Sequence, residues 1–234
     1  MTRYKCYYFI PLILQKIGYC LFWILFKIFV RLEIRGEKKL ADLKGPVILA
    51  ANHTSELDVT AMPLLLPFFS HLNPIHFIMN EKKKFKNPNR FGLRSYIYCT
   101  SFLELLGGVP VVSGHKNYAI ALSNHVALLR KNRTLCVFPE GRITGNGHTE
   151  PAHGGLGYLL YSSRGAKVVP IAINTFYKMS WKEFWFLKRR KVTITVGEPL
   201  KAEDLILPYI TEPTVPDCRA ASQKVLDKIS RLKG

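Results

Sequence analysis

After residue 45, apolar positions fall into two alternating patterns. Short runs rich in β-branched residues predict buried strands, and apolar residues spaced by three or four predict helices. The predicted strands are Val47–Ala51, Ile75–Met79, Val109–Val112, Leu135–Phe138, Val168–Ile173 and Val192–Val196. The predicted helices run from Ser55 to about Leu66, over Asn117–Leu129, over Gly154–Ser163 and onward from near Pro216. Strands that alternate with helices indicate an α/β fold, in which functional residues gather in the loops after the strands.

The N-terminal segment has a different pattern. Cys6–Val30 is almost wholly apolar and aromatic, but Lys16 and Lys27 interrupt it. The longest charge-free stretches are therefore shorter than the ~20 residues that cross a bilayer. Lys5, Lys16 and Lys27 are spaced by eleven, which returns them to nearly the same face of a helix. The segment thus predicts a broad apolar helix with one narrow lysine stripe.

Three arrangements fit this segment. We favour a helix or helix pair in the membrane interface, with lysines toward phosphates and Phe22, Trp23 and Phe26 toward lipid. A tilted span with snorkelling lysines is the second arrangement, and a buried helix or signal segment is the third. Pro11 is expected to bend or split the helix.

Composition narrows the function classes. Lys and Arg number 34 against 16 Asp and Glu, giving a net charge of +18 over 234 residues. A hydrophobic content of 48% excludes a disordered chain, and the length suits one domain with a full core. The charge favours anionic partners. Because basic residues stand beside aromatic ones at Glu81–Lys86 and Trp181–Lys191, we expect a membrane surface rather than nucleic acid.

The cysteines give no sign of a disulfide framework or a metal site. They are odd in number, far apart and without metal-ligand spacing. They are Cys6, Cys20, Cys99, Cys136 and Cys218. We expect them to be reduced, as in a cytosolic compartment.

The most informative polar motif is Asn52–Asp58, directly after the first predicted strand. Histidine is the usual general base near neutral pH, and a carboxylate on its other ring nitrogen fixes the tautomer. Because residues five apart on one helix diverge by about 140°, His53 must lie in the turn and Asp58 in the first helical turn. Ser55 as N-cap gives that arrangement, and Asn52 is expected to hold the turn. The alternative is a purely structural turn and cap.

A second motif, Phe138–Arg142, follows the fourth predicted strand. Arg142 offers a guanidinium that can bind phosphate with two hydrogen bonds, and Gly141 allows close backbone approach. Pro139 and Glu140 precede them in the motif. The alternative is a loop ion pair between Glu140 and Arg142.

The ordered pair of motifs, His-x4-Asp and then Phe-Pro-Glu-Gly, resembles the glycerolipid acyltransferases of the PlsC type over roughly residues 45–200. The resemblance implies a mixed central sheet wrapped by helices, with an N-terminal membrane-binding helical element. It divides the chain into a membrane-associated helical segment, 1–35, and an acyltransferase domain, 36–234. It implies that His53 is the general base, that Asp58 orients it, and that Glu140, Gly141 and Arg142 bind the acceptor.

The sequence departs from the family pattern in two places. Ser113 stands where the family usually has an arginine after an apolar run, and Lys116 is the candidate to replace that cation. Arg142 and Ile143 precede Thr144, whereas lysophosphatidic acid acyltransferases commonly have threonine directly after Phe-Pro-Glu-Gly. Both departures concern the acceptor rather than the acyl-transfer chemistry.

The function expected from this resemblance is acyl transfer from a thioester, acyl-CoA or acyl-carrier protein, to the hydroxyl of 1-acylglycerol 3-phosphate. No cofactor is expected beyond that donor. The expected location is the cytoplasmic face of a membrane, with membrane lipids and a lysophospholipid acceptor as partners. The alternatives are another lysophospholipid or glycerol 3-phosphate as acceptor, or a non-catalytic membrane-surface or nucleic-acid binding protein.

Overall fold

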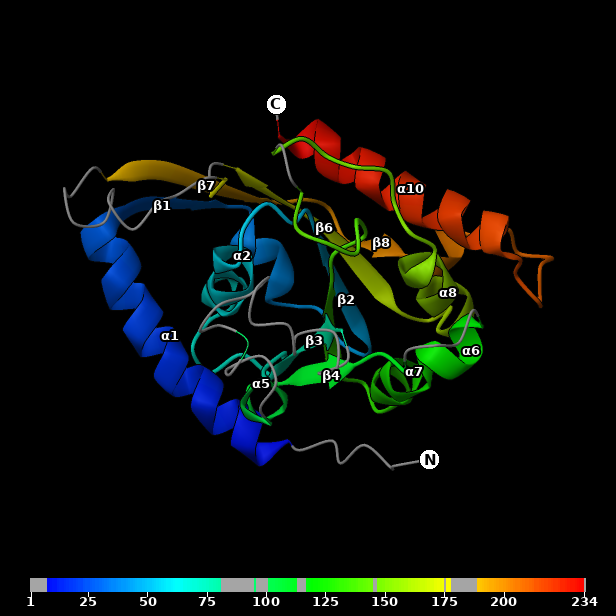
Figure 1. Cartoon of the computed structure of the whole chain (residues 1–234), viewed down its shortest axis with the longest axis horizontal. Coiled ribbons are helices and arrows are strands. Elements are labelled where there is room, and N and C mark those ends of the chain that lie inside the picture. Colours follow the sequence, from blue (N-terminus) through cyan, green and yellow to red (C-terminus); the bar gives the residue numbers. More distant parts are fainter. Residues whose placement is uncertain are drawn as a thin grey trace.

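The computed structural model describes residues 8–80, 95, 101–112, 117–144, 147–174, 176–177 and 189–233, which build one mixed β-sheet between helices (Figure 1). The strands are β1 (Val30–Arg35), β2 (Val47–Ala51), β3 (Ile75–Met79), β4 (Gly108–Pro110), β5 (Thr134–Val137), β6 (Lys167–Asn174), β7 (Arg190–Val196) and β8 (Leu200–Lys201). Their order is β1-β7-β6-β2-β5-β3-β4, with β8 beside β6. β2 is parallel to both neighbours, whereas β7 and β8 are antiparallel to β6. The predicted α/β class with a mixed sheet is confirmed.

Helices cover both faces of the sheet. They are α1 (Phe9–Phe29), η1 (Glu37–Leu40), α2 (Leu57–Ala61), η2 (Met62–Leu65), α5 (Phe102–Leu105), α6 (Tyr118–Ala121), α7 (Ser123–Arg130), α8 (Gly155–Ser162), η4 (Ala202–Asp204) and α10 (Val215–Leu232). All five residues of β2 are fully buried, as expected for a central parallel strand with both faces covered. Val47 and Leu49 pack on the side of α1, α2 and η2, and Ile48 and Ala50 pack on the side of α7, α8 and α10.

The C-terminal helix α10 starts at a capping box. Thr214 accepts from the backbone N–H of Asp217, whose carboxylate accepts from the backbone N–H of Thr214. Its buried face packs on α8, where a Cβ at Gly157 would lie 1.9 Å from the carbonyl oxygen of Cys218. Only glycine permits this close approach, which carries the end of α10 back over the sheet.

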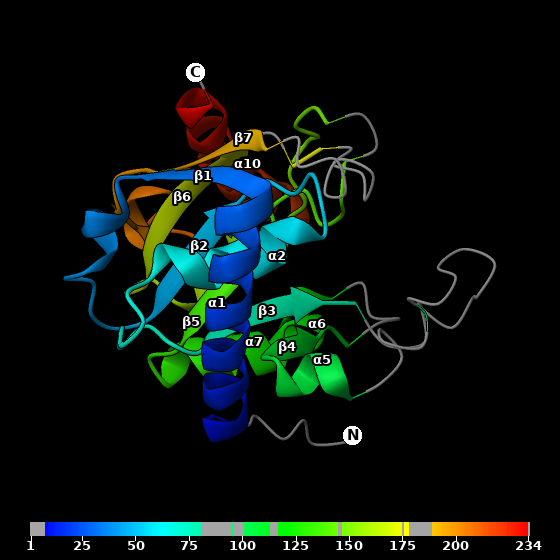
Figure 2. The ribbon, with the colours of Figure 1, turned by 90° about the vertical axis from the view of Figure 1, so that its left-hand side faces the viewer.

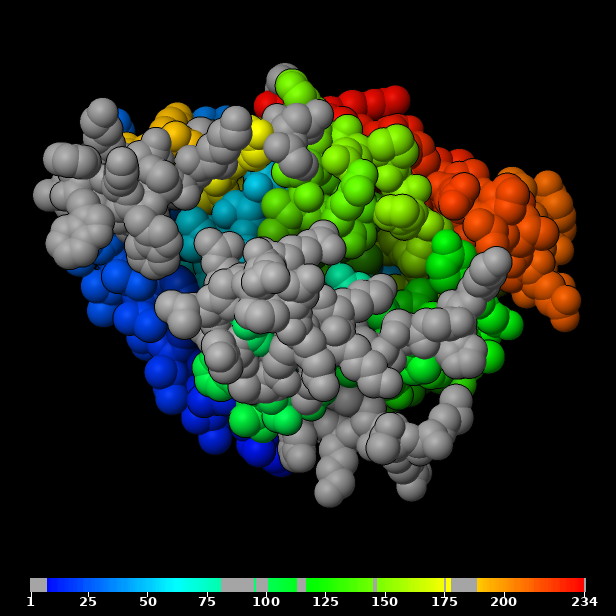
Figure 3. All heavy atoms as spheres, in the orientation of Figure 1, coloured from blue at the N-terminus to red at the C-terminus, as the bar shows by residue number. Residues whose placement is uncertain are grey.

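The N-terminal helix α1 runs along the side of the molecule opposite α10 (Figures 2 and 3). Its inner face includes Phe26, which is 2% exposed and packs on the ring of Phe176. Gln15 is also buried, and its amide bonds the sheet: it donates to the carbonyls of Ile75 (2.6 Å) and Leu106 (2.8 Å), and accepts from the N–H of Ile75 (2.9 Å). The helix is therefore attached to β3 by polar as well as apolar contacts.

The outer face of α1 is an exposed apolar stripe. The stripe consists of Ile10, Ile13, Ile17, Leu21, Ile24 and Ile28, at spacings of three and four residues. The helix has the length and the apolar composition that would let it cross a membrane. Core helices and signal segments share these two properties. One face of α1 thus packs on the domain and the other is apolar and exposed. The interfacial orientation of the helix stays a prediction.

Three details of the N-terminal prediction need correction. α1 is one helix and Pro11 does not split it, because proline is tolerated in a first turn, where no intrahelical donor is lost. Phe26 faces the core rather than lipid. Val30–Arg35, which was predicted to belong to the helical segment 1–35, is the edge strand β1. The division into a segment 1–35 and a domain 36–234 stays a prediction. The strand β1 falls in the first of these two parts.

Elsewhere each predicted strand has a counterpart whose ends lie within two residues. The helix expected over Asn117–Leu129 is broken into α6 and α7 at Leu122. The carbonyl of Ala121 accepts from the N–H of Val112 instead of continuing the helix, which explains the break. The strands β1 and β8 were not predicted.

Replacing Gln15 tests the attachment of α1. Gln15→Leu should lower the free energy of unfolding by about 3 kcal/mol, because a buried N–H and two carbonyls lose their partner. Denaturant unfolding in mild detergent measures this loss. Ile17→Leu, on the exposed stripe of the same helix, is the control and should change little. Equal stability of the two variants would contradict the anchoring role.

Candidate active site

The first motif lies at the carboxyl end of β2, beside the end of β6. Asn52 is fully buried there and bonds the backbone of Ile173 twice, donating to its carbonyl at 2.9 Å and accepting from its N–H at 2.7 Å. These bonds extend the pairing of β2 and β6 by one residue after the last β2 position. The two bonds of Asn52 therefore hold the point at which the chain turns toward His53.

His53 and Asp58 lie in contact. The Nδ1 atom of His53 is 3.1 Å from Oδ2 of Asp58, which is completely buried, whereas the histidine side chain is 14% exposed. The tautomer that donates Nδ1–H to the carboxylate leaves Nε2 as an acceptor for a hydroxyl. The structure thus forms the pair on which the sequence argument depended.

Asp58 is held by the turn that carries His53. Its Oδ2 atom also accepts from the backbone N–H groups of Thr54 (2.6 Å) and Ser55 (2.8 Å). α2 begins at Leu57, and Glu56 occupies the N-cap position that the sequence gave to Ser55. Ser55 still serves the helix start, because its Oγ accepts from the N–H of Leu57 at 3.2 Å. α2 is also short: it ends at Ala61 and continues as η2, not as one helix to Leu66.

The second motif packs directly against the first. The ring of Phe138 stacks on that of His53, with centroids 4.0 Å apart and planes 15° from parallel. Thr144 donates its N–H to the carbonyl of His53 at 2.9 Å. Pro139 is held by the N–H of His153, at 2.8 Å from its carbonyl. Two segments about eighty residues apart in sequence therefore form one site.

Glu140 is the most unusual group of the site. It is 1% exposed, and neither carboxylate oxygen has a hydrogen-bond partner among the described residues. Burial raises the pKa of Glu140 to about 7. The charge of Lys233 and the backbone amide of His53 act in the opposite direction, but their effect is smaller. A carboxyl with such a pKa carries a proton in a large fraction of molecules at neutral pH.

Lys233 lies near Glu140 and Asp58, and the sequence did not indicate this position. It follows α10 and donates to Oγ1 of Thr149 at 2.9 Å. Burial lowers its pKa, while the charges of Glu140 and Asp58 act in the opposite direction. Nothing in the sequence near residue 233 indicates this position, since the end of a C-terminal helix usually reads as solvent-exposed.

Arg142 is paired, but not with Glu140. Its Nε and a terminal nitrogen lie 2.7 and 2.6 Å from Oε2 of Glu150, and its side chain is 70% exposed. The loop ion pair considered between Glu140 and Arg142 is therefore replaced by one with Glu150. Gly141 has φ +68°, and a Cβ there would lie 2.9 Å from Cδ2 of His153, so this turn requires glycine.

The remaining candidates divide as follows. Lys116 and Ser113 lie outside the described residues. Within the described part of the chain, no group of three or more His, Cys, Asp or Glu side chains is arranged to hold a metal ion. The catalytic roles expected of His53 and Asp58 stay predictions. The acceptor-binding roles expected of Glu140, Gly141 and Arg142 also stay predictions.

Comparison with known proteins decides the family. The model of the family described as Acyltransferase matches residues 31–174. The chain belongs to the Acyltransferase family. Both motifs lie inside the matched region, whereas α1 and Lys233 lie outside it.

The relatives agree with this family assignment. The chain is 25% identical to taffazin of Dictyostelium discoideum over 76% of its length, and 26% identical to ovine 1-acyl-sn-glycerol-3-phosphate acyltransferase alpha over 75%. It spans only 63% and 56% of the lengths of these two relatives. The crystal structure of the 1-acyl-sn-glycerophosphate acyltransferase PlsC from Thermotoga maritima has the same fold, with a TM-score of 0.61 over 95% of this chain and 80% of that one, at 20% identity.

The raised pKa of Glu140 predicts a pH-dependent stability difference. Between the ordinary carboxyl pKa and about 7, the folded protein holds this proton more tightly than the unfolded chain, so stability falls as pH rises. Glu140→Gln is neutral at every pH. Its free energy of unfolding, relative to wild type, should therefore rise by about 3 kcal/mol from acid to mildly alkaline pH.

Urea unfolding of both proteins at about pH 5 and about pH 8 measures this change. Glu212→Gln, at an exposed carboxylate, is the matched control and should show no such trend. A difference between Glu140→Gln and wild type that is the same at both pH values would mean that Glu140 does not titrate in this range.

Proposed function

We propose that the protein transfers a fatty acyl group from a thioester to the free hydroxyl of 1-acylglycerol 3-phosphate, giving phosphatidate. The observation that carries this proposal is the contact between His53 and Asp58 beside the Phe138–Arg142 turn, in a chain of the Acyltransferase family. The ovine relative supports the acceptor, since its name states that substrate.

The chemistry follows from the orientation of His53. Its Nε2 accepts the proton of the acceptor hydroxyl as the oxygen attacks the thioester carbonyl carbon. Asp58 stabilises the imidazolium that forms, and the two backbone N–H groups that donate to its carboxylate hold it in place. The C–S bond then breaks, the carbonyl re-forms as an ester, and the thiolate takes the proton from the imidazolium.

The acceptor phosphate is assigned to the cations near the turn. Arg142 is exposed and forms an ion pair with Glu150. When a phosphate binds to Arg142, this ion pair must weaken or break. Lys233 is partly buried and close enough to Glu140 and Asp58 for their charges to act on it. A phosphate dianion placed near them favours protonation of Glu140, which removes a like charge from its surroundings.

The proposal also covers the thioester donor and the place in the cell where the protein acts. The donor is acyl-CoA or acyl-carrier protein, because a thioester is already activated and the site offers a base rather than a nucleophile. The exposed apolar stripe of α1 supports attachment to a membrane, where both the acceptor and the product reside. We assign it to the cytoplasmic face, where these donors are found.

Replacing the base tests the reaction. His53→Ala should lower the turnover number by about 10²–10⁴, and Asp58→Asn should also lower it by favouring the wrong tautomer. The assay follows free thiol released from the thioester, with and without lysophosphatidate, and identifies the product by mass. His71→Ala, at a histidine outside both motifs that bonds the carbonyl of Leu43, is the control for loss of a partly buried imidazole. Release of thiol by wild type without any lysolipid requirement, or undiminished turnover in folded His53→Ala, would refute the proposal.

The pairing of Arg142 with Glu150 gives a prediction on acceptor affinity. Arg142→Ala should raise KM for lysophosphatidate about ten-fold or more, because a charge-assisted bond to phosphate is worth ~1.5–3 kcal/mol. Glu150→Gln should lower it, but only a few-fold, since an exposed ion pair is worth ~0–1 kcal/mol. KM for the thioester should not change in either variant. If Arg142→Ala raised KM for the thioester as much as KM for lysophosphatidate, or raised only KM for the thioester, the loop would not be the acceptor-binding element.

A further inference from the structure

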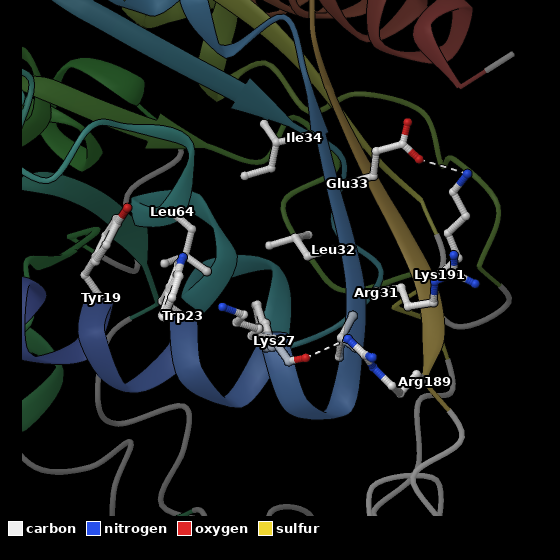
Figure 4. Close-up of a pocket in the computed structure, with 12 residues that line it drawn as sticks. Tyr19, Trp23, Lys27, Arg31, Leu32, Glu33, Ile34, Leu64, Arg189 and Lys191 are labelled. Carbon is white, nitrogen blue, oxygen red and sulfur yellow. Dashed lines mark hydrogen bonds and ion pairs between the residues drawn. The ribbon is translucent and has the colours of Figure 1, made fainter.

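A groove lies between α1 and the edge strand β1, with a volume of about 650 Å³ (Figure 4). This volume falls within the range of ligand sites. Its apolar lining comes from three elements: α1, β1 and η2. These residues are Tyr19, Trp23, Phe26, Val30, Leu32, Ile34 and Leu64.

The rim of the groove is cationic. Lys27, Arg31, Arg189 and Lys191 line it, together with a single carboxylate, Glu33. Glu33 is paired with Lys191 at 2.8 Å. The other three cations have no carboxylate partner in the described part of the chain, so the rim carries an excess of positive charge.

The three unpaired cations are held in different ways. Arg189 donates to the carbonyl of Lys27 at 2.7 Å, and the Nζ of Lys27 lies 4.7 Å from the centroid of the Trp23 ring. Arg31, exposed on β1, makes no ion pair within the described residues. A backbone carbonyl and an aromatic face leave the charge of a cation largely available to an anion.

The groove borders the apolar stripe of α1. At about 100° per residue, Trp23 and Lys27 lie on the helix between its buried face and the stripe Ile10–Ile28. An amphiphile in contact with the stripe can therefore reach the groove without leaving the helix surface. No residue of either catalytic motif lines the groove, and β1 is separated from β2 in the sheet by β7 and β6.

We propose that this groove binds an anionic phospholipid of the surrounding membrane at a site separate from the active site. An acyl chain lies along the apolar lining, and the phosphate is bound by Arg31 with Lys27 and Arg189. The apolar lining alone suits any chain, so the preference for an anionic lipid comes from the rim. The proposal does not depend on the catalytic role of His53.

Short-chain lipids below their micelle concentration test the site without a membrane surface. Trp23 lines the groove and becomes the single fluorescent reporter when Trp181 and Trp185 are changed to phenylalanine. Dihexanoyl phosphatidylglycerol should give a saturable change in Trp23 emission. Dihexanoyl phosphatidylcholine, with the same chains, should bind at least several-fold more weakly, and glycerol 3-phosphate, without chains, should give no change.

Variants locate the site. Arg31→Gln and Lys27→Gln should each weaken phosphatidylglycerol binding about five-fold, the effect of one cation near an anionic lipid. Lys38→Gln, at an exposed lysine on η1, should leave it unchanged. His53→Ala should also bind normally, so loss of catalysis and loss of this site are told apart. Equal binding of both lipids, or equal binding by Arg31→Gln and Lys38→Gln, would overturn the proposal.

Discussion

The geometry of the active site depends on one buried carboxylate oxygen. Oδ2 of Asp58 accepts from His53 and from the backbone N–H groups of Thr54 and Ser55. Because a buried polar group is costly unless it is hydrogen-bonded, these donors lower the cost of burying the carboxyl group in the core. The same bonds close the turn between β2 and α2. One interaction therefore fixes the loop conformation, the histidine tautomer and the start of the helix.

The second half of the site is assembled by contacts that are distant in sequence. β2 and β5 are parallel neighbours, so the segments after them meet at one edge of the sheet. The stacking of Phe138 on His53 and the bond from Thr144 hold the turn that carries Glu140, whose carboxylate has no hydrogen-bond partner among the described residues. α10 adds Lys233 from the far end of the chain. The site thus combines Asp58, whose carboxylate is hydrogen-bonded, with Glu140, a carboxyl whose pKa is raised by burial.

Local patterns carried much of this arrangement. The alternation of strands and helices predicted the class, and the position of each motif after a strand predicted that they would meet. β1 also has a visible signal, since Val30, Leu32 and Ile34 alternate with charged residues, but the preceding apolar helix obscured where it begins. Other features have no local signal. The pairing of Arg142 with Glu150 and the position of Lys233 depend on tertiary contacts, which spacing along the chain does not encode.

The amide of Gln15 has a consequence for how the protein meets a membrane. A helix that only anchored the protein would be joined by a linker and would move independently of the catalytic sheet. Here the helix bonds the first residue of β3 and contributes Phe26 to the core. With α1 on a membrane, as proposed above, the height of His53 above the lipid surface would be set by the fold and not by a linker. Removing the apolar N-terminus would also take the buried side chains of Gln15 and Phe26 away from the domain, so truncation is expected to destabilise it.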